Sequence, residues 1–407
     1  MVTIVKRDLL DHIMQRIDRK EVILITGARQ VGKTTLMKEI ERELRKRGEK
    51  TLYINLEDRD YLIMMNESPK NLLKFLGEGK TYVFIDEIQY LDDPTHFVKF
   101  LYDEYKDRIK LIVSGSSAFY LDRKFRDSLA GRKRLFILNT FSFKEFLRAK
   151  GKEELLNKYE LLPVRREIKN LLEEYCIYGG YPEVVMEKNI AEKKEILKEL
   201  VNSYVKKDAI GADIRNEHKF FQLMKLLSGR AGKLINKTEI SRILQVSVKL
   251  IDNYLYLMEK AFYIARVSPF YTNKTKEITK RKKIFFRDTG LRNVLINDFK
   301  FLEERSGGDR GQLVENLFFR MLMDFYPIED IKFWISKGGG EVDFIVEEKA
   351  GYEIKYTGRK INIKKYKEFE DKYKIKVSVI DFEKIPEIYI KWIKKINSLI
   401  KSRFKER

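Results

Sequence analysis

Short apolar runs alternate with longer helical or loop stretches over the first 140 residues of the chain. The runs are rich in β-branched and aromatic residues, which is typical of strands buried in a parallel sheet. Strands are expected at residues 21–26, 51–56, 81–86, 110–114 and 134–138. This alternation predicts a three-layer α/β domain over residues 1–150, with a ligand at the carboxyl edge of a parallel sheet.

The middle of the chain carries three helical patterns followed by two β-rich segments. The helices are expected near residues 217–227, 236–244 and 248–260, and the strands at 262–267 and 283–287. The loop between these strands holds Lys274, Lys276, Lys280, Arg281 and Lys282. This order predicts a winged helix over residues 215–290, with the basic loop as its wing.

A winged helix can bind DNA or pack against other domains. If it binds DNA, Lys249, Asn253 and Tyr256 of the third helix would face a groove, while the wing lysines would contact phosphates. Asp252 and Glu259 on the same helix oppose a contact in the major groove. Both interpretations therefore stay open.

A glycine-rich sequence with the spacing of a phosphate-binding loop follows the first expected strand. It reads Gly27-Ala28-Arg29-Gln30-Val31-Gly32-Lys33-Thr34, which has the form G-x-x-x-x-G-K-T, and Thr35 continues into a helical stretch. The glycines let backbone N–H groups surround phosphate oxygens, and the helix N-terminus adds positive potential. Lys33 is expected to reach the β- and γ-phosphates, and Thr34 to supply a hydroxyl ligand to Mg²⁺. Residues 27–35 are therefore predicted to bind ATP.

Two carboxylates end the apolar strand that begins at Tyr82. Asp86 is expected to belong to the Mg²⁺ shell, and Glu87 to polarise the attacking water, which favours hydrolysis over binding alone. The strand at residues 110–114 ends at Ser114, a candidate for orienting that water. Alternatively, Ser114 caps a helix or turn.

An arginine-rich segment at residues 122–132 precedes the last strand of this domain, and it is expected near the γ-phosphate edge. Arg132 is a candidate arginine finger, which would compensate charge on the transferred phosphoryl group. A neighbouring subunit can supply such a group, and the chain would then form at least a homodimer. The alternative is a solvated basic loop.

The C-terminal third holds a second set of candidate catalytic residues, Glu315, Asp343, Glu353 and Lys355. Because side chains alternate along a strand, Glu353 and Lys355 share one face. Asp343 and Glu353 would hold one or two divalent ions, and Glu315 would complete a site for phosphodiester hydrolysis. Two alternatives stay open: the E-x-K pattern arises by chance in a chain rich in both residues, and nuclease-like domains can lose cleavage.

Composition adds an excess of positive charge. The 83 Lys and Arg residues against 62 Asp and Glu residues give a net charge of +21, which favours a polyanionic partner, most simply DNA. An ion-pair-rich surface of a heat-adapted protein would explain part of this charge. Cys176 is the only cysteine and the three histidines are scattered, so neither a disulfide nor a Cys/His metal site is expected.

Hydropathy bears on localisation. No apolar run approaches twenty residues, and the sequence does not begin with a signal-peptide pattern. We therefore expect a cytoplasmic protein without a membrane partner.

Several motifs together resemble a known family. They are the P-loop with its Arg-Gln-Val insert, Ile85-Asp86-Glu87-Ile88-Gln89, Ser114-Gly115-Ser116-Ser117, Leu129-Ala130-Gly131-Arg132 and Tyr178-Gly179-Gly180-Tyr181-Pro182. Over nearly the whole chain they resemble archaeal and bacterial AAA-type ATPases with a C-terminal nuclease-like domain. The resemblance implies a helical lid at residues 151–214, with the Gly180-Tyr181-Pro182 turn near the nucleotide. The alternative for that turn is an ordinary loop.

The expected C-terminal domain, residues 291–407, looks like the PD-(D/E)XK nuclease superfamily. The likeness rests on the expected strand at residues 342–346 and the hairpin that leads to Glu353-Ile354-Lys355. Val342 stands where the superfamily has a proline before the first acid. The resemblance implies an α/β nuclease-like domain that uses metal ions.

Two main functional hypotheses agree with these motifs, and a third possibility is a protein of a mobile element in which ATP hydrolysis licenses a nuclease. The first is an ATP-hydrolysing, DNA-binding protein that remodels or processes branched or broken DNA, with a metal-dependent nuclease site. The second is a nucleotide-dependent molecular switch in defence or regulation, whose C-terminal domain does not cleave. Stimulation of ATP hydrolysis by particular DNA structures would distinguish them.

Overall fold

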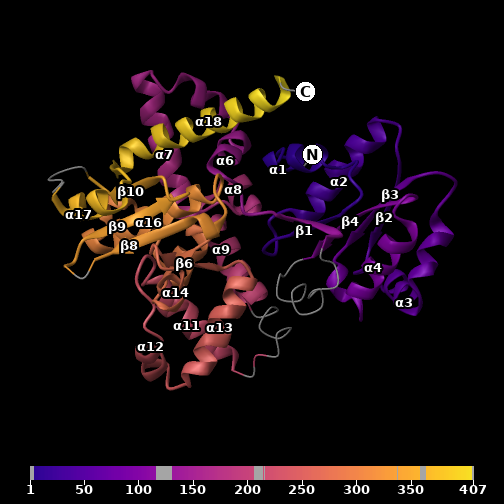
Figure 1. Cartoon of the computed structure of the whole chain (residues 1–407), viewed down its shortest axis with the longest axis horizontal. Helices are drawn as coiled ribbons and strands as arrows, with labels where there is room; N and C mark the ends of the chain where they lie inside the picture. The colour runs from indigo at the N-terminus through magenta and orange to yellow at the C-terminus, as the bar shows by residue number, and fades with distance from the viewer. Residues whose placement is uncertain are drawn as a thin grey trace. The chain divides into compact units, whose positions relative to one another are not determined.

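The computed structural model describes residues 4–115, 131–205, 214, 216–336, 338–357 and 364–405 (Figure 1). The chain forms two compact units. The first comprises Met1–Phe141 with Lys260–Phe262, and the second comprises Ser142–Glu259 with Tyr263–Arg407. The first unit therefore ends before residue 150, where the sequence placed its boundary.

The first unit contains the expected parallel sheet, coloured indigo to purple in Figure 1. Its strands are β1 (Val22–Thr26), β2 (Lys50–Asn55), β3 (Thr81–Asp86), β4 (Ile109–Gly115) and β5 (Lys133–Ile137). They lie in the order β2-β3-β4-β1-β5, and every neighbouring pair is parallel. The strands expected from the apolar runs are thus confirmed to within one residue at each end.

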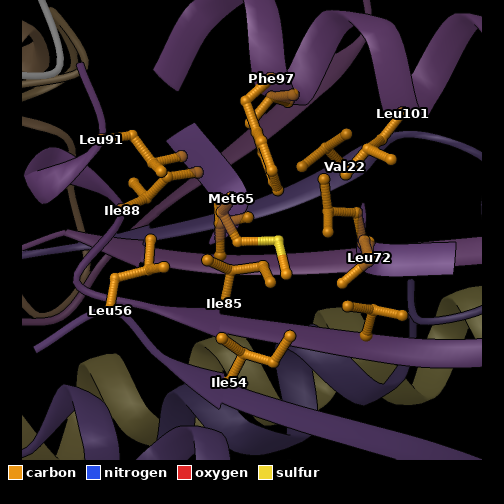
Figure 2. Packing of buried hydrophobic residues seen from close by; sticks show 14 of the residues in the cluster. Val22, Ile54, Leu56, Met65, Leu72, Ile85, Ile88, Leu91, Phe97 and Leu101 are labelled. Carbon is orange, nitrogen blue, oxygen red and sulfur yellow. The ribbon is translucent and has the colours of Figure 1, made fainter. Parts of the chain in front are cut away.

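Helices of the first unit pack on the apolar side chains of this sheet. They are α1 (Asp8–Met14), α2 (Lys33–Lys46), α3 (Arg59–Glu67) and α4 (Pro94–Tyr105), with short 3₁₀ segments η1 (Pro69–Phe75) and η2 (Ile88–Tyr90). Figure 2 shows one buried cluster, in which Ile85 of β3 lies among Met65 of α3, Leu72 of η1 and Phe97 of α4. Val83 belongs to the same cluster because alternate residues of a strand face one side of the sheet.

Local capping interactions explain where several helices begin. Asp93 accepts a hydrogen bond from the amide of His96 at 2.9 Å, and Pro94 occupies the first turn of α4. Ser142 and Glu145 form a reciprocal capping box at α6 (Phe143–Ala149). This cap marks the start of the second unit.

Helices dominate the first half of the second unit. After α6 come η3 (Glu153–Lys158), α7 (Leu162–Tyr178), α8 (Pro182–Met186), α9 (Ile190–Glu199) and the π-helical η4 (Leu200–Val205). The next three helices are α11 (Glu217–Ser228), α12 (Lys237–Leu244) and α13 (Val248–Lys260). The sequence predicted both the helical segment after residue 151 and these three helices.

One six-stranded sheet occupies the rest of the second unit. Its strands are β6 (Ile264–Pro269), β7 (Lys283–Phe286), β8 (Ile331–Ile335), β9 (Glu341–Val346), β10 (Ala350–Lys355) and β11 (Val377–Asp381), in the order β11-β10-β9-β8-β6-β7. The hairpin of β6 and β7 joins the C-terminal strands because β6 pairs in parallel with β8. α15 (Thr289–Leu295) spans residue 290, where the sequence placed a domain boundary.

The remaining helices flank this sheet. They are α14 (Lys274–Thr279), α16 (Gly307–Leu322), α17 (Lys364–Tyr373) and α18 (Ile385–Lys405), with 3₁₀ segments η5 (Leu302–Glu304), η6 (Ile328–Asp330) and η7 (Phe382–Lys384). Phe319 of α16 stacks on Phe285 of β7 with ring centroids 4.7 Å apart. Among the described residues, no helix combines the length and apolar character needed to cross a membrane.

The Gly179-Gly180-Tyr181-Pro182 turn packs closely against α15. The amide of Gly180 donates to Asp288 Oδ2 at 2.8 Å, and Asn293 Nδ2 donates to the carbonyl of Ile177 at 2.8 Å. A Cβ atom on Gly290 would lie 2.1 Å from the carbonyl oxygen of Tyr178. These contacts give the turn a structural role within the second unit, and its expected place near a nucleotide stays a prediction.

Candidate functional site

The P-loop connects the end of β1 to the start of α2, in the strand-loop-helix arrangement that the sequence predicts. Gln30 and Gly32 have left-handed backbone conformations, with φ of 58° and 91°. A Cβ atom on Gly27 would lie 2.1 Å from the carbonyl oxygen of Leu138, so only glycine fits there. The loop therefore has the tight curvature by which backbone amides surround a phosphate.

Positive charge and a hydroxyl group meet at the start of α2. Lys33 is buried, and its Nζ lies over the loop, where it donates to the carbonyl of Ala28 at 2.9 Å. Thr34 and Thr35 occupy the first turn, which presents its amide groups beyond the helix N-terminus. These are the groups that the sequence assigned to phosphate and Mg²⁺.

Arg7 ties the P-loop to the chain that follows β5. Its guanidinium donates to the carbonyl oxygens of Val31 and Asn139, both at 2.7 Å, and lies 4.9 Å from the centroid of the Phe141 ring. Arg7 is buried, so these hydrogen bonds are shielded from water. Sequence reasoning missed this residue because a basic residue before the first helix gives no signal of its distant partners.

Asp86 is fixed at the carboxyl edge of the sheet by donors from neighbouring strands. It is buried, and the hydroxyl of Tyr53 in β2 donates to its Oδ2 at 2.7 Å. The hydroxyl of Ser114 in β4 and the amide of Glu87 both donate to Oδ1. Burial, followed by the negative charge of Asp86, raises the pKa of Tyr53, so this hydroxyl stays a neutral donor.

Ser114 contacts both acidic residues at the end of β3. Its fully buried hydroxyl donates to Asp86 and accepts the amide of Glu87 at 3.2 Å. The donor is directed to a carboxylate inside the protein, and the expected role of Ser114 in orienting water stays a prediction. In this structure Ser114 positions the two acidic residues.

Glu87 follows Asp86 directly and has a left-handed backbone, with φ of 58° and ψ of 47°. This conformation is uncommon for a residue other than glycine and is found at sites where the surrounding structure holds it. The side-chain amide of Gln89 donates to Glu87 Oε2. The Glu87 side chain is half-buried, and the contact with Gln89 holds its carboxylate at the end of β3.

Replacing Tyr53 with Phe should lower the affinity for Mg²⁺ in ATP turnover. The substitution removes one donor to Asp86, and a hydrogen bond to a charged group contributes about 1.5–3 kcal/mol. We expect a shift of about tenfold in the Mg²⁺ dependence of kcat, measured by titration at saturating ATP. The matched control is Tyr61→Phe, because the Tyr61 ring packs on Phe75 in α3 and η1. Identical Mg²⁺ titrations for both variants would contradict this role of Tyr53.

Arg132 lies at the opposite edge of the sheet from the P-loop. Its carbonyl accepts the amide of Val22, which begins β1, whereas the P-loop follows the end of β1. Its Nε donates to Asp103 at 2.8 Å. The expectation that Arg132 lies near the γ-phosphate edge of its own chain was wrong, since a five-residue strand spans about 16 Å. Residues 116–130 lie outside the described part of the chain.

The carboxylates of the C-terminal motif come together in the second unit. Glu315 lies on α16, Asp343 on β9 and Glu353 on β10. Burial, then the charges of Glu315 and Glu353, raise the pKa of Asp343 well above its ordinary value. A Cβ atom on Gly232 would lie 2.6 Å from Glu315 Oε2, so a glycine makes room for this carboxylate.

A lysine that sequence reasoning missed lies among these carboxylates. Lys283 begins β7, is 2% exposed and places Nζ 2.8 Å from Glu341, 3.0 Å from Glu315 and 3.8 Å from Asp343. Burial lowers the pKa of Lys283, but the surrounding carboxylates outweigh it and raise the pKa overall. Its ammonium therefore stays charged.

The predicted metal site does not fit this arrangement. Glu353 Oε1 accepts Lys355 Nζ at 2.6 Å, and Asp343 Oδ2 accepts the amide of Ile354 at 2.8 Å. In the described ranges, no group of three or more His, Cys, Asp or Glu side chains is arranged to hold a metal ion. Lys283 Nζ lies within 4 Å of Glu315, Glu341 and Asp343, and Glu353 pairs with Lys355 and Lys365, so each carboxylate already has an ammonium partner. The assignment of Asp343 and Glu353 as metal ligands stays a prediction.

The helices α11, α12 and α13 and the hairpin of β6 and β7 follow one another in the expected order. The expected wing, however, is not a plain loop. The segment between β6 and β7 contains α14, and Glu277 of α14 pairs with Lys332 at 2.8 Å. Exposed basic residues here are Lys276, Lys280 and Arg281.

On α13, Lys249 and Asn253 are exposed and Tyr256 is half-buried. Both acidic residues of this helix have basic partners. Asp252 accepts Lys237 Nζ at 2.7 Å, and Glu259 accepts Arg266 Nε at 2.9 Å.

Comparison with protein families identifies two parts of the chain. Residues 19–147 match a family described as an AAA domain, and residues 169–301 match a domain of unknown function, DUF8612. The first range contains the P-loop, Asp86, Glu87 and Ser114. The first unit is therefore an AAA-type P-loop domain.

Relatives resemble the chain over most of its length. The uncharacterized protein MJ1544 of Methanocaldococcus jannaschii is 28% identical over 362 residues, which cover 85% of this chain and 78% of that protein. An uncharacterized protein of Haemophilus influenzae is 28% identical over 357 residues, which cover 84% of each chain.

Similar solved structures include the Thermotoga maritima RuvB Holliday junction branch migration motor. It has 16% identity and a TM-score of 0.33, and the match covers 67% of this chain and 94% of that chain. The ADP form of the Aeropyrum pernix ORC2 protein has 15% identity and a TM-score of 0.37, with 65% and 87% of the two chains covered.

Proposed function

We propose that the first unit binds ATP with Mg²⁺ and hydrolyses it. The observation that carries this proposal is that the P-loop, Ser114 and Asp86 lie at the same edge of the sheet. Ser114 is in register with Ile25, just before the P-loop, and it contacts Asp86 on the next strand. Because neighbouring strands are about 4.8 Å apart, the P-loop and Asp86 are separated by about two strand spacings.

In this proposal each residue has a separate task. Backbone amides of residues 27–35 and the Lys33 ammonium bind the phosphates, and Thr34 and Asp86 offer oxygen ligands for Mg²⁺. A bound Mg²⁺ would neutralise phosphate charge. Glu87 accepts a proton from the attacking water, and its contact with Gln89 orients the carboxylate.

We also propose that the second unit binds DNA. Exposed Lys249 and Asn253 on α13 and exposed Lys276, Lys280 and Arg281 around α14 support this, together with the net charge of +21. The pairing of Asp252 and Glu259 with basic residues reduces the repulsion that these acids would cause. ATP turnover would then change how the protein handles DNA.

A nucleotide-dependent switch with a C-terminal domain that does not cleave is the second candidate. One observation favours it over a nuclease: the buried Lys283 ammonium lies 3.0 Å from Glu315 and 2.8 Å from Glu341. In this version ATP binding and hydrolysis set the affinity for a nucleic acid or protein partner. A slow ATPase rate that no DNA stimulates would support it.

The two candidates differ in how DNA affects ATP turnover. ATP hydrolysis should be measured on single-stranded, duplex, forked and four-way DNA, with DNA cleavage followed in the same reactions. Strong stimulation by one structure is expected for the DNA-dependent ATPase. The same slow rate on every DNA would exclude it and leave the switch.

The basic surface is tested by the triple variant Lys276→Gln/Lys280→Gln/Arg281→Gln. We expect weaker DNA binding and a log–log salt slope less negative by about 2–3, because each phosphate contact contributes about 0.9. The control is Lys158→Gln/Lys198→Gln/Lys391→Gln, which removes the same charge from lysines that pair with glutamates within their own helices. Equal affinities and slopes for the two triple variants, in fluorescence anisotropy, would refute this DNA-binding surface.

A further inference from the structure

The carboxylate set of the second unit already holds a cation of the chain itself. Lys283 Nζ contacts Glu341 and Glu315 at hydrogen-bond distance, and Asp343 lies 3.8 Å away. Oxygen ligands that converge on one positive centre are the usual environment of a divalent ion. Here the centre is an ammonium on β7 that joins α16 to β9.

Charge balance explains why this arrangement needs no metal ion. Each carboxylate of the set has an ammonium within 4 Å, since Glu353 lies 2.6 Å from Lys355 and 3.5 Å from Lys365. The three ammonium groups of Lys283, Lys355 and Lys365 therefore face four carboxylates, those of Glu315, Glu341, Asp343 and Glu353. A divalent ion bound to Glu315 and Asp343 would lie close to the Lys283 ammonium, which is buried and cannot turn outward into water.

The surroundings hold Lys283 and its partners in place. Glu315 packs closely against Gly232, because a Cβ atom on Gly232 would lie only 2.6 Å from Glu315 Oε2. Glu353 is 1% exposed, and its Oε2 has no hydrogen-bond partner among the described residues. An oxygen that could bind a metal ion is therefore present, but Lys283 takes the central position.

We propose that Lys283 is the built-in cation of this site and excludes divalent ions from Glu315, Asp343 and Glu353. The second unit accordingly has no metal-dependent nuclease centre in the native chain. Removal of the Lys283 charge would convert the same carboxylates into a divalent-cation site. This inference does not depend on ATP hydrolysis by the first unit.

The direct test measures Mn²⁺ binding to the full chain without nucleotide, so the P-loop does not contribute a nucleotide-bound ion. Wild type and the exposed-lysine control Lys198→Met should bind no Mn²⁺ in the second unit at submillimolar concentration. Lys283→Met should bind one Mn²⁺ per chain, because a neighbouring positive charge is gone. Its affinity for Mn²⁺ should be at least about tenfold higher than that of wild type. Adding Asp343→Asn should abolish this gain.

The thermal midpoint gives a second readout of the same variant. Trp334 and Trp392, the two tryptophans of the chain, both lie buried in the second unit, so their fluorescence reports its unfolding. Lys283→Met should unfold at a lower temperature than wild type, and Mn²⁺ should raise the midpoint of this variant without affecting wild type. A Mn²⁺-independent midpoint in the variant would count against a latent metal site.

Two results would overturn the proposal. One is stoichiometric Mn²⁺ binding by wild type that Asp343→Asn removes, and the other is a folded Lys283→Met variant that binds no Mn²⁺. If Lys283→Met does not fold, reductive methylation of native wild-type protein replaces it. Lys283 should stay unmodified with and without Mn²⁺, whereas methylation of Lys283 only in the presence of Mn²⁺ would show that the ion displaces it.

Discussion

Replacing Glu87 with Gln should reduce kcat for ATP hydrolysis by at least about 100-fold and leave ATP binding nearly unchanged, because a positioned general base contributes about 10²–10⁴-fold. Gln keeps the size of the side chain and its contact distance to Gln89, but it cannot accept a proton. The backbone of Glu87 is already left-handed, and Gln tolerates the same conformation as Glu. Release of phosphate under single-turnover conditions measures the effect on chemistry.

Lys33→Ala provides the contrast for this experiment. It should weaken ATP binding itself, since the Lys33 ammonium lies over the phosphate-binding loop. Lys38→Ala, an exposed position on the same helix, should behave like wild type in both assays. A Glu87→Gln variant that turns over ATP at the wild-type rate would remove Glu87 from the mechanism. Weak ATP binding by that variant would show that Glu87 acts on binding and not on proton transfer.

The sequence predicted the first unit well because its signals are local. Each buried strand is a continuous apolar run, and the P-loop spacing reflects contacts of one short segment with a phosphate. Asp86 and Glu87 were found because they directly follow such a run. The AAA domain match covers the same residues.

Contacts between distant residues were not predicted. Tyr53 reads as an ordinary strand residue, yet its hydroxyl reaches Asp86 on the neighbouring strand at 2.7 Å. The position of Arg132 depends on its pairing with Val22, which no local pattern reveals. Spacing along the chain therefore identified the reactive groups but not the residues that hold them.

The carboxylates of the second unit show the same difference between local patterns, which the sequence reveals, and contacts between distant residues, which it does not. The E-x-K pattern correctly placed Glu353 and Lys355 on one strand, and the fold brings Asp343 and Glu315 to them. Lys283, in contrast, looked like the first residue after a basic loop. Its burial follows from the pairing of β6 with β8, which joins the hairpin to the C-terminal sheet. Because the sequence did not predict that pairing, it did not reveal the ammonium beside Glu315 and Asp343.

Substitution of Gly179, in the turn after α7, should have a large effect on the stability of the second unit. Gly179 has φ of 74° and ψ of −163°, a backbone region that is essentially restricted to glycine. A Cβ atom there would lie 2.0 Å from Asp288 Oδ1. Asp288 would have to move, although it caps α15 through the amide of Leu291 at 3.1 Å and accepts the amide of Gly180 at 2.8 Å.

Gly179→Ala should therefore destabilise the second unit by about 2–4 kcal/mol, the sum of backbone strain of about 1–3 kcal/mol and the loss of a helix cap of about 1 kcal/mol. Urea unfolding followed by tryptophan fluorescence measures this unit, since both tryptophans belong to it. The matched control is Gly151→Ala. Gly151 also has a positive φ, 68°, but nothing lies within 4 Å of the added Cβ atom, so the expected cost is only about 1–2 kcal/mol. If the two variants lost equal stability, backbone strain alone would explain the effect, and the close contact between the turn and Asp288 would contribute nothing.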